Sequence, residues 1–264
     1  MRGEICVGFG SLLSFVAVLL MIFVHVGQIN TSNVPRNIFM AKVNVSAYGD
    51  AVHFAIIDPV YNLYTDNASA PLEQAAGLRQ LYKFGLYSHC AYVNDTAGRC
   101  GNETIGEQYK PYDALLTDMP ANWSIFSQSF IPDTTTFPNS SFLGHNSKAA
   151  YWMLLLGMLC GAAAFITGVA KHNMTFLVST LFAIAGSLLL LIGASIWTVI
   201  IQRSAAINDL VVHTANENQT MPLGIVVSVG PGLFLTWAAF ACLVVSVVPY
   251  MIRYDICFVR AYIK

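Results

Sequence analysis

Two cysteines, Cys90 and Cys100, carry the clearest chemistry, because they are the only thiols in the long polar segment 27–148. Nine residues separate them, and in an oxidising compartment a lone pair at this spacing is expected to form a disulfide. A redox or metal-binding pair is the alternative, although two thiols without convergent histidines make a weak metal site. The adjacent His89 is expected to be a surface or packing histidine, with pH sensing as the alternative. The sequence therefore predicts one disulfide, with neither a metal site nor a cofactor.

Asparagines in Asn-x-Ser/Thr sequences form a second group of reactive residues. Seven such acceptors lie in the long polar segment, more than its asparagines would give by chance. An eighth lies in a shorter polar segment nearer the carboxyl end. This density predicts that both segments face the lumen or the cell exterior. The expected glycosylation sites are Asn30, Asn44, Asn67, Asn94, Asn102, Asn122, Asn139 and Asn218.

No arrangement of residues predicts catalysis. A covalent mechanism needs a nucleophile paired with a base, or a convergent set of charged groups. The long polar segment holds His53, His89 and His145 with several acids, but at no recognisable spacing. The net charge of −1 also argues against nucleic-acid binding, which needs a basic face. We therefore expect a protein that is not an enzyme and has no nucleic-acid partner.

The elements that position these residues are four apolar spans. The chain is 56% hydrophobic and only 10% charged, whereas soluble domains carry about 25% charged residues. Each span reaches the roughly 20 residues that a helix needs to cross a bilayer. None contains Asp, Glu, Lys or Arg, which argues against an ion-coupled pump. The predicted spans are 5–26, 149–170, 176–201 and 223–252.

The first span could instead be a cleaved signal peptide. Against this, Arg2 and Glu4 cancel where a signal peptide would be positively charged, and the apolar run is long. Basic residues of the short loops then set the orientation, because they favour the cytosolic side. With both termini in the cytosol, that side carries Arg2, Lys171, Arg253, Arg260 and Lys264, and the short outer loop carries only Arg203.

This topology divides the chain into alternating cytosolic and extracellular parts. The extracellular domain is 27–148, and a second, short extracellular loop is 202–222. The cytosolic parts are the amino terminus 1–4, the turn 171–175 and the tail 253–264. Because the tail has no serine or threonine, we expect contacts through the spans, lipids and the extracellular domain.

Small residues should let the spans approach closely. Bundle packing within one chain is the expected use, and dimerisation is the alternative. The Gly230-Pro231-Gly232 sequence should kink the fourth span, because proline removes a backbone hydrogen bond, and a hinge is the alternative. The small residues expected to pack the spans against one another are Gly10, Ser14, Gly157, Gly161, Ala164, Gly168, Gly186 and Gly193.

The extracellular domain shows a mixed pattern. Alternating valines predict a strand at 41–46, and 84–93 is predicted to be another. Apolar residues at helical spacing predict a short helix at 72–81, and 104–138 should pack irregularly over a small sheet. Cys6 and Cys257 lie at the cytosolic ends of spans, so they are candidates for palmitoylation or simply buried thiols.

The stretch that contains the two cysteines also contains a recognisable motif. Gly85-Leu86-Tyr87, two residues, Cys90 and then Cys100 resembles the glycine-leucine-aromatic-x-x-cysteine motif of the claudin superfamily. Tyr87 stands where animal claudins have tryptophan. The resemblance implies a four-helix transmembrane bundle with a small, mainly β extracellular domain pinned by the disulfide.

A second stretch, 38–46, resembles the segment after the first span in the fungal Sur/PalI family of tetraspan plasma-membrane proteins. That resemblance implies a role in organising membrane domains, namely eisosome-type furrows, and in cell-wall integrity and endocytosis. Partners would be membrane lipids and other membrane proteins, including further copies of the chain. The alternative is a claudin-like accessory subunit of a channel, a cell-fusion complex or a pH-signalling complex.

Overall fold

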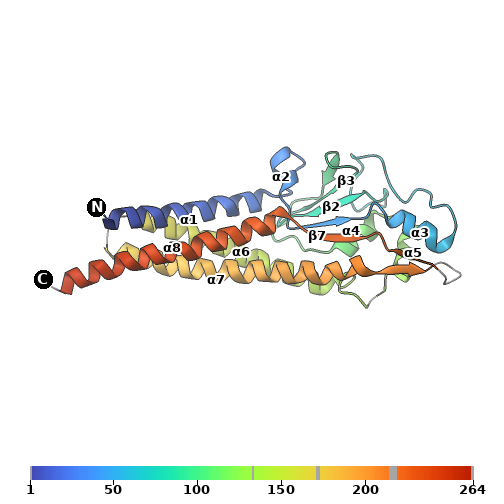
Figure 1. The fold of residues 1–264 in the computed structure, drawn as a ribbon. Coiled ribbons are helices and arrows are strands. Elements are labelled where there is room, and N and C mark those ends of the chain that lie inside the picture. The colour runs from blue at the N-terminus through green and yellow to red at the C-terminus, as the bar shows by residue number, and fades with distance from the viewer. Residues whose placement is uncertain (1, 133, 171–172, 214–218, 263–264) are drawn as a thin grey trace. The chain divides into compact units, whose positions relative to one another are not determined.

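The computed structural model describes residues 2–132, 134–170, 173–213 and 219–262, and it describes no side chains for 2–7, 129, 173–174 and 252–262. Figure 1 shows the order of the helices and strands along the chain. Two compact units are present. The helical unit contains Met1–Val24, Ala149–Ser195 and Phe234–Lys264, and the sheet unit contains His25–Lys148 and Ile196–Leu233.

Four long helices supply the spans, as predicted. Each contains an apolar stretch long enough to cross a bilayer, and these stretches have mean hydropathies between 2.0 and 2.4. Each of the four helices extends beyond its expected span at one or both ends. The helices are α1 (Arg2–Val26), α6 (Ser140–Val169), α7 (Asn173–Ser204) and α8 (Pro231–Tyr262).

The predicted start of the fourth span is wrong, and so is the predicted kink. Residues 226–229 form a strand, and helix α8 begins at Pro231. Proline suits the first position of a helix, because the backbone N–H that it lacks would have no partner there. The backbone N–H groups of Gly230 and Gly232 instead bond to the carbonyls of Met40 and Phe39, at 2.9 Å each. The only proline inside the described part of α8 is Pro249.

Small residues pack the helices of the helical unit, as predicted for bundle packing. A side chain at Gly157 would meet Leu190 of α7 at 2.8 Å, and one at Gly193 would meet Leu154 of α6 at 2.6 Å. Glycine therefore lets α6 and α7 approach closely. Contacts within this unit also involve Gly10, Ser14, Gly161, Ala164, Gly168 and Gly186.

The sheet unit is built on five antiparallel strands in the order β4-β3-β2-β1-β7. Strand β1 confirms the strand predicted from the alternating valines. Strand β7 comes from the segment just before the last span, so segments before the second span and before the fourth span contribute to one sheet (Figure 1). The strands are β1 (Ala41–Asn44), β2 (Leu81–Phe84), β3 (His89–Tyr92), β4 (Gly98–Cys100) and β7 (Val226–Val229), with a separate β5 (Val211–His213) and β6 (Thr220–Pro222) hairpin.

Two local predictions for the sheet unit, those for 84–93 and 104–138, are wrong. The expected single strand 84–93 is two strands joined by a turn at 85–88. The segment 104–138, expected to be irregular, contains two helices, one of which starts with Pro111 in its first turn. Short helices of the sheet unit are α2 (Asn33–Asn37), α3 (Tyr48–Ile56), α4 (Pro111–Asp118) and α5 (Ala121–Phe130), followed late in the chain by the 3₁₀ turn η1 (Ala205–Asp209).

The helix expected at 72–81 is also absent from the described structure, and its hydrogen bonds explain why. Glu73, Ala75 and Gly77 have positive φ angles of 61°, 53° and 104°, which do not occur in a right-handed helix. Their backbone N–H groups bond to helix α4 instead. The Ala75 and Gly77 amides donate to the carbonyls of Thr117 and Asp118 at 2.9 and 2.8 Å. Bonds between distant segments have replaced helical bonds.

The same region holds a buried ion pair. Arg79 is fully buried and Asp118 is 1% exposed, and Arg79 Nη1 lies 3.3 Å from Asp118 Oδ2. The Tyr82 hydroxyl donates to the same carboxylate oxygen at 2.7 Å, and the Glu73 amide donates to Oδ1 at 2.6 Å. Burial and the nearby Asp118 raise the pKa of Tyr82 well above its ordinary value. This network ties the loop before β2 to α4.

Candidate functional site

The Gly85-Leu86-Tyr87 motif forms the tight turn between β2 and β3. The Gly85 amide donates to the Ser88 carbonyl at 2.9 Å. A side chain at Gly85 would lie 2.5 Å from the carbonyl oxygen of Gly27, so only glycine fits. Leu86 is fully buried, and the Tyr87 hydroxyl lies 3.1 Å from His25 Nδ1. The motif therefore makes the turn and attaches it to the end of α1.

Gln28, which the sequence did not single out, holds this turn in place. It is fully buried, and its amide nitrogen donates to the carbonyls of three residues of the α2 region at 2.7 to 3.0 Å. Its amide oxygen accepts from the Tyr92 hydroxyl at 3.1 Å. Its own carbonyl accepts from the Ser88 hydroxyl. The position of Gln28 just after an apolar span is the one sequence signal that could have identified it.

The predicted disulfide between Cys90 and Cys100 is confirmed. The two residues lie directly opposite each other on β3 and β4. The bond therefore fastens the edge strand β4 to the rest of the sheet. Backbone bonds continue this attachment into the next loop: the Gly101 amide donates to the His89 carbonyl at 2.9 Å, and the Thr104 amide donates to the Tyr87 carbonyl at 2.7 Å.

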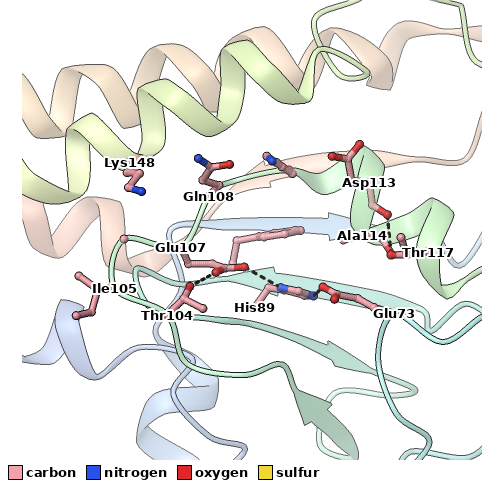
Figure 2. Close-up of a pocket in the computed structure, with 13 residues that line it drawn as sticks. Glu73, His89, Thr104, Ile105, Glu107, Gln108, Asp113, Ala114, Thr117 and Lys148 are labelled. Atoms are coloured by element: carbon pink, nitrogen blue, oxygen red, sulfur yellow. Dashed lines mark hydrogen bonds and ion pairs between the residues drawn. The ribbon is translucent and has the colours of Figure 1, made fainter.

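A polar cleft of about 470 Å³ opens beside this loop. Figure 2 shows His89 between Glu73 and Glu107, with Thr104 beside Glu107. The distances are 3.8 Å from His89 Nε2 to Glu73 Oε1 and 3.5 Å from His89 Nδ1 to Glu107 Oε1. His89 is buried and stacks on Phe84, with ring centroids 5.6 Å apart. Other polar residues that line this cleft are Gln108, Lys110, Asp113, Thr117 and Lys148.

The carboxyl group of Glu107 has a perturbed pKa. Burial alone would raise this pKa, but hydrogen bonds with His89 and with the Thr104 hydroxyl outweigh burial and lower it below the ordinary value of 4.5. The ionised form of Glu107 is therefore favoured in the folded protein. Because Glu73, His89 and Glu107 come from three separate segments, their contacts hold these segments together.

A second cleft of about 390 Å³ adjoins the first. Glu73, His89, Thr104 and Glu107 line both clefts, so these four residues form the wall between them. The second cleft also contains an acceptor asparagine, Asn102. Its remaining lining residues are Pro71, Leu72, Gln74, Arg99, Cys100 and Gly101. Carboxylate and amide groups line both clefts, and the Arg99 guanidinium lines the second. These groups can exchange hydrogen bonds with a polar ligand.

The structure brings together few of the other predicted site residues. The acceptor asparagines lie on separate loops, strands and helices. Asn44 lies half-buried on β1, whereas the others that the structure describes are exposed, namely Asn30, Asn67, Asn94, Asn102, Asn122 and Asn139. Asn218 and the side chains of Cys6 and Cys257 lie outside the described residues. Within the described parts of the chain, no three His, Cys, Asp or Glu side chains are placed to hold a metal ion.

One comparison places the chain in a known protein family. A family model described as the SUR7/PalI family matches residues 6–248. The match therefore extends from the first span into the fourth and includes the whole five-stranded sheet. A comparison with curated proteins gives no match.

Proposed function

Because this chain belongs to the SUR7/PalI family, we propose that it organises domains of the plasma membrane. In this proposal it is a non-enzymatic, fungal tetraspan protein of eisosome-type furrows that supports cell-wall integrity and endocytosis. The observation that carries the proposal is the family match over residues 6–248. Its partners are membrane lipids and other membrane proteins, including further copies of itself.

The same proposal places both termini in the cytosol and makes the protein a glycoprotein. Basic residues on the short loops support this orientation. Exposure supports the glycans, because six of the seven acceptor asparagines in the sheet unit lie at its surface. Cys6 and Cys257 would then lie on the cytosolic side, where palmitoylation occurs.

The test is live imaging of the protein, tagged at its carboxyl end, in fungal cells with and without the furrow-forming scaffold. Stable cortical patches that disperse without the scaffold are the expected result. A uniform or tip-restricted signal that ignores the scaffold would contradict the furrow assignment. Glycopeptide mapping of the same protein tests its orientation, since acceptor sites in the sheet unit should be occupied.

A second candidate function is that of an accessory subunit of a channel, a cell-fusion complex or a pH-signalling complex. It is favoured by exposed apolar side chains on the sheet unit, because such groups suit contact with another protein. Tyr61 is 71% exposed, Ile125 is 70% exposed and Ile57 is 61% exposed. Co-purification with a channel, or a calcium current that changes on deletion, would favour this function over the first.

A further inference from the structure

The smaller cleft is built next to one attachment point for a glycan. Asn102 lines this cleft and begins the acceptor sequence Asn102-Glu103-Thr104. Its surroundings are rigid, because the disulfide fixes Cys100 and backbone bonds hold Gly101 and Thr104 to the turn and strand beside them. A sugar attached at Asn102 therefore starts from a fixed position at the edge of the cleft.

The lining of the cleft matches the chemistry of an N-acetylhexosamine. Such a sugar presents hydroxyl groups and an acetamido group, which need both donors and acceptors. The side chains of Glu73, Gln74 and Arg99 supply both kinds of group, and Glu73 and Gln74 are exposed. Pro71 and Leu72 add an apolar surface for a sugar ring. The volume of about 390 Å³ lies within the range of sites for small molecules.

Because the glycan is attached to Asn102, weak contacts are sufficient to hold it in the cleft. A ligand on a short tether has an effective concentration in the millimolar range, so even a weak site can be occupied. A free sugar of the same kind would first lose translational and rotational freedom on binding, whereas an attached one has already lost most of it.

We propose that the N-linked glycan on Asn102 docks its first N-acetylglucosamine residues into the cleft lined by Gln74, Arg99 and Glu73. The glycan then covers one side of the wall formed by His89 and its two carboxylates, and leaves the larger cleft open. This inference depends on the extracellular placement of the sheet unit proposed above.

Release of glycans under native conditions tests the docking. The full-length protein, made in a fungal host and purified in detergent, is treated with an amidase that cuts between asparagine and the first sugar, and release is followed by glycopeptide mass spectrometry. Asn94, which lies in an exposed turn between β3 and β4, is the internal reference. We expect release at Asn102 to be at least about tenfold slower than at Asn94, the factor that about 1.4 kcal/mol of protection gives.

Variants distinguish docking of the glycan from steric hindrance of the amidase by the protein around Asn102. The Gln74→Ala/Arg99→Ala protein keeps the acceptor sequence but loses two lining groups, so release at Asn102 should speed up several-fold while release at Asn94 stays the same. The exposed Gln80→Ala change, outside the described lining, is the control and should alter neither rate.

Equal release at the two sites, or no effect of the double variant, would overturn the docking. So would an unoccupied Asn102 in a protein that carries a glycan at Asn94. If no acceptor of the sheet unit carries a glycan, the docking fails together with the extracellular placement. These outcomes distinguish failure of this inference from failure of the proposed function.

Discussion

The contacts inside the helical unit differ in kind from the contacts inside the sheet unit. In the helical unit, close contacts depend on glycines, such as Gly157 against Leu190, because glycine has no side chain to keep the helices apart. Hydroxyl pairs add to these contacts, such as Thr167 and Ser179 at 2.7 Å. The sheet unit depends instead on groups that are present, above all the buried Arg79–Asp118 pair. Consequently, removing one buried polar group should destabilise the sheet unit most. Replacing one packed glycine with a larger residue should destabilise the helical unit most.

The largest effect is expected from Asp118→Asn. This change removes the charge that compensates the fully buried Arg79, and an uncompensated buried charge costs about 3–5 kcal/mol. Thermal unfolding of the purified protein in detergent should show a large loss of stability. The exposed Asp58→Asn change is the matched control and should have little effect. Equal unfolding of the two variants would contradict the difference between the units.

The Cys90→Ser change should rank second. A disulfide that closes a loop of this length, with a sequence separation of 10, stabilises by roughly 2–3 kcal/mol. Because both cysteines form the same bond, Cys90→Ser/Cys100→Ser should cost no more than either change alone. Cys242→Ala, a free cysteine of the helical unit, is the control. Additive losses in the double variant would show that the cysteines act separately.

Gly157→Leu tests the helical unit by adding volume. A side chain there would lie 2.8 Å from the Leu190 side chain and 3.2 Å from the Leu190 backbone nitrogen, so Leu190 or the α7 backbone must shift, at a cost of about 1–3 kcal/mol. Gly8→Leu is the matched control, because no neighbouring atom lies within 4 Å of a side chain at that position. The two variants can be compared by unfolding in detergent. If Gly8→Leu is the more damaging, close approach is not what holds this unit together.

The smallest effect concerns pH and Glu107. Its pKa in the folded protein lies below the ordinary 4.5, so its ionised form stabilises the fold above pH 4.5. That contribution is lost as the pH falls through the lowered pKa. Melting temperature measured against pH should therefore fall less steeply on the acid side in Glu107→Gln than in the parent. The exposed Glu103→Gln change should leave the slope as it is.

The parts of the fold that depend on composition and local pattern were predictable. Four apolar spans, the strand at 41–44 and the Cys90–Cys100 bond follow from hydropathy, alternation and cysteine spacing. The segment 72–81 was not predictable, because amides such as that of Ala75 bond to residues about forty positions away. The strand 226–229 looked like part of a span, because valine suits both a bilayer and a sheet.

The candidate site shows the same division. The glycine motif identified the turn, since a tight turn needs glycine at a fixed position. The sequence does not identify Gln28 or Glu107, because a glutamine or glutamate that gains its role from distant partners has no local pattern. For His89 the sequence predicts a surface or packing histidine, and packing is the alternative that the structure shows, because the ring is buried against Phe84. Its two carboxylate neighbours, Glu73 and Glu107, have no local sequence signal.

The pairing of β1 with β7 has a consequence for biosynthesis. Ala41 pairs with Val229, which the ribosome adds 188 residues later. At 5–20 residues per second, β1 waits roughly 10–40 s for its partner, whereas the hairpin closed by the disulfide can form almost at once. During that interval β1 is an unpaired strand edge, to which another nascent chain could bind. A chain that stops before β7 keeps this edge indefinitely, so it should be degraded.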